Sequence, residues 1–138
     1  MPRIKALVLT MILSALPLSA PAAGIPLVDA AGAARGSATV SLPRGVIVLK
    51  IKGLAPLPAS INTGSETFTA HVYKAYIVAS ADPAVEIFLG DVYPNGKQSA
   101  IRKATFKGDL SAMGLNRIAV TAFSKDGLKS FDVLAATF

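Results

Sequence analysis

The chain has 138 residues, of which 52% are hydrophobic and 16% are charged, with a formal net charge of +6 and a mean hydropathy of +0.54. It contains no Cys and a single His, which excludes a disulfide scaffold, a thiolate zinc site and a cysteine nucleophile. The apolar content argues against disorder of the whole chain, and the length suits one domain.

The first residues have the pattern of an export signal. Arg3 and Lys5 give a positive start, and residues 6–18 form an apolar run of about 13 residues. Such a run has the length of a signal-peptide core and is short for a bilayer span. We therefore expect a secreted or periplasmic protein.

A cleavage site follows this run. Ala20 and Ala22 supply the small side chains of an A-x-A site. We expect residues 1–22 to be a signal peptide that is removed after Ala22; cleavage after Ala23 and retention as a membrane anchor are the alternatives. Removal would lower the net charge from +6 to +4.

Residues 23–37 are rich in Ala and Gly and show no periodicity, so we expect a flexible N-terminal arm. Within this arm, residues 25–28 form a short apolar piece that could dock as an edge strand. Pro26 favours the edge, because proline has no amide hydrogen to donate to a sheet ladder.

Residues 38–138 show β-branched or alternating runs between turn signals, and no run has the period of a long amphipathic helix. The Pro-Asn-Gly at 94–96 and the Lys-Asp-Gly at 125–127 each predict a hairpin. About seven short strands at regular spacing predict an all-β domain, an antiparallel β-sandwich of immunoglobulin-like, Greek-key type. The expected strands are residues 38–42, 46–52, 68–80, 85–93, 97–106, 117–124 and 129–138.

The ionisable residues form no catalytic or metal-binding motif. His71 lies within a strand, and the chain has no G-x-S-x-G elbow and no D-x-D-x-D-G calcium loop. Asp82, Asp109 and Asp126 fall in turns, where Asp caps the backbone. We expect no enzyme activity, no cofactor and no metal site; a small hydrolase or carbohydrate-binding domain is a minor alternative.

Basic and aromatic residues are the candidate binding groups. Basic side chains on outward strand faces could attract anionic surface polymers, and tyrosines could line a recognition face. The alternatives are lysines that protect edge strands from aggregation and rings that pack in the core. The candidate binding residues are Tyr73, Tyr76, Lys50, Lys52, Arg102 and Lys103.

Several stretches resemble the extracytoplasmic domain of anti-sigma-K-type factors. They are VIVLKIKGLAPLP at 46–58, VYKAYIV at 72–78, IFLGDV at 87–92 and LNRIAVT at 115–121. The resemblance covers residues 38–124 and implies a compact β-sandwich that acts as an envelope-facing sensing or interaction module, without catalytic residues. Family members place this domain after a sigma-binding segment and a transmembrane helix, so sigma inhibition is not expected of this chain.

We therefore expect a non-enzymatic interaction module of the bacterial envelope. Its partner would be an envelope protein or a surface polymer, with no nucleic acid and no stable membrane span after cleavage of the signal. The alternative is a self-assembling extracellular structural subunit, in which the arm at 23–37 adds as a strand to a neighbouring copy.

Overall fold

The structure, a computed structural model, describes residues 24–138; the expected signal peptide with Ala20 and Ala22 lies outside the described residues. The described chain is all-β and antiparallel, as predicted, with nine strands where about seven were expected. A short 3₁₀ turn, Ser111–Met113, precedes β8. The strands are β1 (Ile25–Val28), β2 (Ala34–Ser41), β3 (Val46–Ile51), β4 (Ala59–Asn62), β5 (Thr67–Ala79), β6 (Asp82–Val92), β7 (Ala100–Thr105), β8 (Arg117–Ser124) and β9 (Ser130–Thr137).

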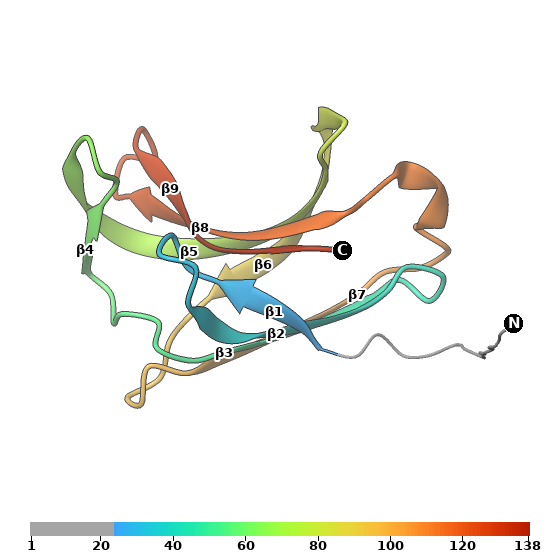
Figure 1. Cartoon of the computed structure of the whole chain (residues 1–138), viewed down its shortest axis with the longest axis horizontal. Coiled ribbons are helices and arrows are strands. Elements are labelled where there is room, and N and C mark those ends of the chain that lie inside the picture. Colours follow the sequence, from blue (N-terminus) through green and yellow to red (C-terminus); the bar gives the residue numbers. More distant parts are fainter. Residues whose placement is uncertain (1–23) are drawn as a thin grey trace, which may run out of the picture.

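The strands form one hydrogen-bonded sheet that curls on itself. Their order is β4-β5-β8-β9-β1-β2-β3-β7, and β6 pairs with β5 beyond the stretch that β4 occupies. Figure 1 shows β5, β8 and β9 in one layer and β2, β3 and β7 in the facing layer, with β1 between them. Curling brings β6 and β7 together, and the Arg102 Nε of β7 donates a hydrogen bond of 3.0 Å to the Leu89 carbonyl of β6.

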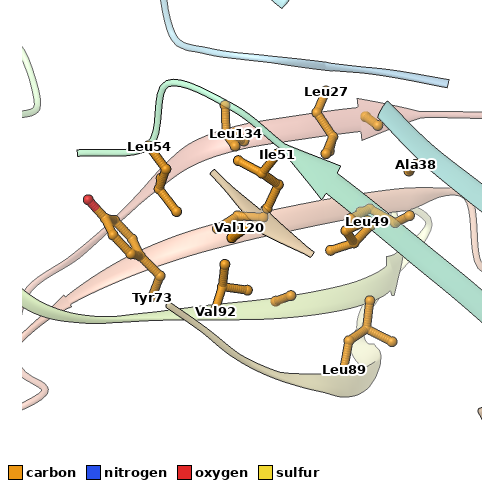
Figure 2. Close-up of a cluster of buried hydrophobic side chains, with 14 of the residues drawn as sticks. Leu27, Ala38, Leu49, Ile51, Leu54, Tyr73, Leu89, Val92, Val120 and Leu134 are labelled. Atoms are coloured by element: carbon orange, nitrogen blue, oxygen red, sulfur yellow. The ribbon is translucent and has the colours of Figure 1, made fainter. Parts of the chain in front are cut away.

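The core lies between these layers. Side chains in a strand alternate between its two faces, so every second residue points inward. Leu49 and Val120 are fully buried and Tyr73 is 1% exposed. Leu134 of β9 is buried in the same cluster (Figure 2). Each such aliphatic side chain contributes about 1.5–3 kcal/mol when it leaves water, so this cluster is the main source of stability.

The segment expected to be a flexible arm is largely part of the sheet. β1 pairs with β2 along its length and with β9 at Val28, so it occupies an internal position and not the expected edge. The register shifts between Pro26 and Val28, which shows how the sheet accommodates a proline there. Leu27 is fully buried, and this burial holds β1 in place.

Two further expectations about strands are wrong. β4 was not expected, because its few residues follow a proline-rich stretch, yet Ala59 and Ile61 are buried and pair with β5. The Pro-Asn-Gly at 94–96 turns the chain but joins no paired hairpin, since β6 pairs with β5 and β7 pairs with β3. The chain crosses between the two layers at this turn.

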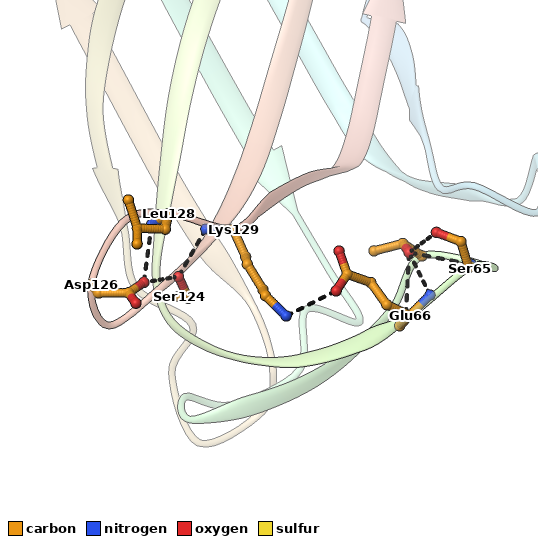
Figure 3. A network of polar contacts seen from close by, with 7 residues as sticks. Ser65, Glu66, Ser124, Asp126, Leu128 and Lys129 are labelled. Carbon is orange, nitrogen blue, oxygen red and sulfur yellow. Dashed lines mark hydrogen bonds and ion pairs between the residues drawn. The ribbon is translucent and has the colours of Figure 1, made fainter.

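The second predicted hairpin is confirmed, because β8 and β9 pair across the turn that contains Asp126. The Asp126 carboxylate accepts hydrogen bonds from the Ser124 hydroxyl at 2.6 Å and the Leu128 amide at 3.0 Å. Lys129 then donates to Glu66 at 2.9 Å, which links this turn to the start of β5 (Figure 3). Within residues 24–138, no helix is long and apolar enough to cross a membrane.

Candidate functional site

The outer surface of β5 and its neighbours brings aromatic and charged side chains together. Tyr76 points outward because it alternates with buried residues of β5. The register places Phe88 of β6 on one side of Tyr76 and Ala119 of β8 on the other. We call this surface the β5 face. It comprises Lys74, Tyr76, Val78, Glu86, Phe88, Asp91, Arg117, Ala119, Thr121 and Asp132.

The β5 face contains a hollow of about 470 Å³. Ala119 is 4% exposed and lies beside Tyr76 across the β5–β8 pairing, and Phe123 lines the hollow farther along β8. Its rim includes Glu86, Arg117 and Asp132. The hollow thus combines apolar walls with a charged rim.

Hydrogen bonds position Asp132 and Arg117 on one side of the rim. Asp132 accepts a hydrogen bond from the Thr121 hydroxyl at 2.7 Å and from an Arg117 nitrogen at 3.1 Å. These two hydrogen bonds orient the carboxylate, and the bond from Arg117 is charge-assisted. Glu86 differs, because no Lys or Arg among residues 24–138 lies within ion-pair distance of it. A cation that enters the hollow would meet Glu86 as the available carboxylate.

A second polar cluster borders the hollow. Lys74 Nζ lies 3.8 Å from Asp91 and 5.5 Å from the centre of the Phe88 ring, and the Tyr93 hydroxyl donates to Asp91 at 3.0 Å. The Phe88 and Tyr76 rings are 5.5 Å apart and tilted by 50°. The contact with Phe88 limits the motion of the Tyr76 ring, which favours its use as a rigid wall.

The Tyr76 phenol stays protonated over the physiological range. Burial raises the pKa of Tyr76 above its ordinary value, and the nearby carboxylates of Glu86 and Asp91 add to this rise. A neutral phenol can donate a hydrogen bond as well as pack against an apolar group. Tyr76 is therefore suited to both apolar and polar contacts with a ligand.

The structure separates the two tyrosines that the sequence grouped as binding residues. Tyr76 lines the hollow, whereas Tyr73 is buried in the core and its hydroxyl donates to the Ala55 carbonyl at 2.8 Å. Placing Tyr73 on a surface recognition face was wrong. The two residues are three positions apart in one strand, so they point to opposite faces.

The four basic candidates do not form one stripe. Lys50 of β3 and Lys103 of β7 lie on the outer face of these strands, away from the β5 face. Lys52 follows the end of β3 and borders a shallow hollow of about 360 Å³ with Lys50 and Ser37. Arg102 points to the seam between β6 and β7, where it bonds the Leu89 carbonyl. Arg102 therefore has a structural contact and not a free binding surface.

Arg117, Phe123 and Asp132 are hollow-lining residues that the sequence reasoning missed. The sequence did contain a signal for Arg117 and Phe123. Both alternate with Ala119 and Thr121 along β8, so the four residues share one face. Asp132 could not be added without the pairing of β8 with β9, which places it opposite Thr121.

The site offers polar and apolar contacts. In the part of the chain that the structure describes, no group of three or more His, Asp or Glu side chains is placed to hold a metal ion. His71 is exposed at an irregularity of β5 between Ala70 and Val72. Searches against protein families, curated proteins and solved structures find no match for this chain.

Proposed function

We propose that the protein is an exported, non-enzymatic interaction module of the bacterial envelope, and that the hollow on the β5 face binds a segment of an envelope protein. The observation that carries the proposal is this hollow, with apolar walls beside a charged rim. We further propose that the fold is of the immunoglobulin-like sandwich type, like the extracytoplasmic domain of anti-sigma-K-type factors. The two facing layers support this assignment.

The walls indicate the chemistry of the bound segment. Rigid aromatic side chains such as Tyr76 and Phe123 provide large contact areas at low conformational cost, which is typical of residues that dominate binding energy. An aliphatic or aromatic side chain of the partner would fill the space above Ala119. A neighbouring Lys or Arg of the partner would then pair with Glu86, the rim carboxylate that has no ion pair within residues 24–138.

Export rests on the signal-like pattern of residues 1–22. Sequencing of the N-terminus of the secreted protein should return Ala23 as the first residue. An N-terminus at Met1 in the membrane fraction would instead support retention as an anchor.

Selection from a random peptide library tests the proposed site. We expect enriched peptides to carry an apolar residue next to Lys or Arg, and we expect Tyr76→Ala to weaken them at least tenfold, because a ring wall is lost. Glu86→Gln should reduce the preference for Lys or Arg in the peptide and leave the preference for the apolar residue unchanged. Tyr93→Ala is the matched control, since that ring is 66% exposed and does not line the hollow.

Two results would contradict this function. Peptides that bind Tyr76→Ala as well as the native chain would place the binding site elsewhere. Failure to enrich any peptide, together with binding of the chain to a glycan array, would support the carbohydrate-binding alternative.

The self-assembly alternative is not favoured by the fold. Strand addition by the N-terminal segment would require β1 to leave its own sheet, where it pairs with β2 and β9. The burial of Leu27 opposes that release.

A further inference from the structure

The outer surface of β2, β3 and β7 is a second surface, separate from the β5 face, and we call it the β3 face. The inward residues of β3 are buried, so the alternate ones point outward. The cross-strand register arranges the outward residues in three rows. The rows are Ser37–Lys50–Ile101, Thr39–Val48–Lys103 and Ser41–Val46–Thr105.

An exposed aliphatic side chain lies among lysines on this face. Ile101 is 73% exposed, Lys50 is its direct cross-strand partner, and Lys103 follows two residues later on the same side of β7. Neither lysine has a carboxylate within ion-pair distance among residues 24–138. The other residues of the rows are Ser, Thr and Val, and none of the three rows contains an acidic residue.

Basic and acidic residues are also separated along the whole described chain. Residues 30–65 and 92–108 contain eight Lys and Arg and no Asp or Glu, whereas the rest of residues 24–138 contains four Lys and Arg and all eight Asp and Glu. The first group includes β2, β3 and β7, which Figure 1 shows together in one layer. The β3 face therefore lies in the basic layer of a polar molecule.

We propose that the β3 face binds the surface of an anionic phospholipid membrane. Lys50 and Lys103 would contact lipid phosphates, and Ile101 would enter the boundary between headgroups and acyl chains. Basic residues around an exposed apolar side chain are the combination that binds proteins to anionic bilayers. The exposure of Ile101 selects the membrane over a soluble polyanion, because a charged polymer offers an aliphatic side chain no apolar environment.

This site is independent of the peptide-binding hollow. The β3 face and the β5 face lie on different strands of the curled sheet. A molecule adsorbed through β3 and β7 would keep the hollow open to a partner. Tyr76→Ala should weaken peptide binding and leave membrane binding unchanged. A negative result for one proposal therefore leaves the other intact.

Sedimentation with lipid vesicles tests the inference. The chain of residues 23–138 should bind vesicles of phosphatidylcholine mixed with phosphatidylglycerol and not phosphatidylcholine alone, and binding should weaken as salt rises. Replacing Lys50 and Lys103 together by Gln should lower the partition coefficient about 25-fold, since each lysine near an anionic surface contributes about fivefold. Ile101→Ser should lower it about tenfold.

Matched controls come from the turn between β8 and β9. Leu128 is 85% exposed and Lys125 is also exposed, so Leu128→Ser removes an exposed aliphatic side chain and Lys125→Gln removes one exposed positive charge on the other layer. Both controls should bind vesicles like the native chain. The thermal melting of every variant should be unchanged, because all of these side chains point to solvent.

Three outcomes would overturn the proposal. The first is equal binding to neutral and anionic vesicles, or binding to neither. The second is unchanged binding by Ile101→Ser together with full displacement by soluble polyphosphate, which would identify a polyanion site. The third is self-association at low salt that Lys50→Gln and Lys103→Gln abolish, which would identify a second copy of the chain as the occupant.

Discussion

At the scale of single residues, the seam between β6 and β7 depends on one arginine and one glycine. Gly90 has φ of +129°, and a Cβ at this position would overlap the Arg102 guanidinium. The absent side chain leaves the space through which Arg102 reaches the Leu89 carbonyl at 3.0 Å. The two residues therefore form one structural unit that joins β6 to β7 where no strand pairing does so.

This unit predicts coupled effects on stability. Arg102→Ala should lower the free energy of unfolding by about 1.5–3 kcal/mol, the contribution of a hydrogen bond to a charged group. Gly90→Ala should cost at least about 2 kcal/mol, from the overlap and from the positive φ. In denaturant titrations the double variant should cost less than the two single variants combined, because removing Arg102 relieves the overlap. Additive costs would show that the residues act separately.

The buried phenol of Tyr73 predicts an alkaline limit to stability. Burial raises the pKa of Tyr73 above its ordinary value of 10.0, so the folded chain holds this proton more tightly than the unfolded chain does. The stabilisation is complete below the unfolded pKa and is lost as pH rises through the raised folded pKa. Melting temperatures measured upward from neutral pH should fall above about pH 10.

Conservative variants separate this effect from general alkaline unfolding. Tyr73→Phe should flatten the alkaline decline and cost about 1 kcal/mol at neutral pH, since the hydrogen bond to the Ala55 carbonyl is lost. Tyr93→Phe, at a ring that is 66% exposed, should retain most of the decline. Equal slopes for the native chain and Tyr73→Phe would rule out Tyr73 as the cause.

At the scale of secondary-structure elements, the stability of the chain should depend on β1, because β1 is a strand of the sheet and not a free arm. Leu27→Ala should lower the free energy of unfolding by about 2–5 kcal/mol, because Leu27 is fully buried between β2 and β9. Leu128→Ala, at a residue 85% exposed, should leave it nearly unchanged. If Leu27→Ala instead leaves stability intact and abolishes an oligomer, β1 acts in a neighbouring copy.

Local pattern was sufficient for the strands whose evidence lies within their own residues. Alternation predicted β3, β5, β8 and β9 closely, because one buried face leaves a period of two in the sequence. The pairing of β6 and β7 was mispredicted, because the Pro-Asn-Gly turn specifies a reversal of the chain and not the neighbours of the strands. β4 was missed because its four residues carry too little periodicity, and β1, considered only as an edge strand, has an internal position that its four residues could not reveal.

The candidate site was likewise predictable only where the evidence lies within a single strand. The outward directions of Tyr76, Lys50 and Lys103 could be read from strand alternation. The hollow could not, because it requires Ala119 to lie beside Tyr76 and Asp132 to lie opposite Thr121 across separate strands. Charge segregation was present in the sequence, but it became spatial only when β2, β3 and β7 were found in one layer.

At the scale of the whole molecule, this segregation predicts behaviour that net charge alone does not explain. A rigid chain with basic residues in one layer should adsorb to a negatively charged resin through that layer, as charges farther than about 10 Å from the resin are screened at 0.1 M salt. Replacing Lys50 and Lys103 by Gln should therefore shift cation-exchange elution to clearly lower salt. Replacing Lys125 and Lys129 removes the same charge from the other layer and should shift elution less. Equal shifts for the two pairs would mean that the molecule presents no preferred face, and the basic layer would then lose its role in recognising an anionic surface.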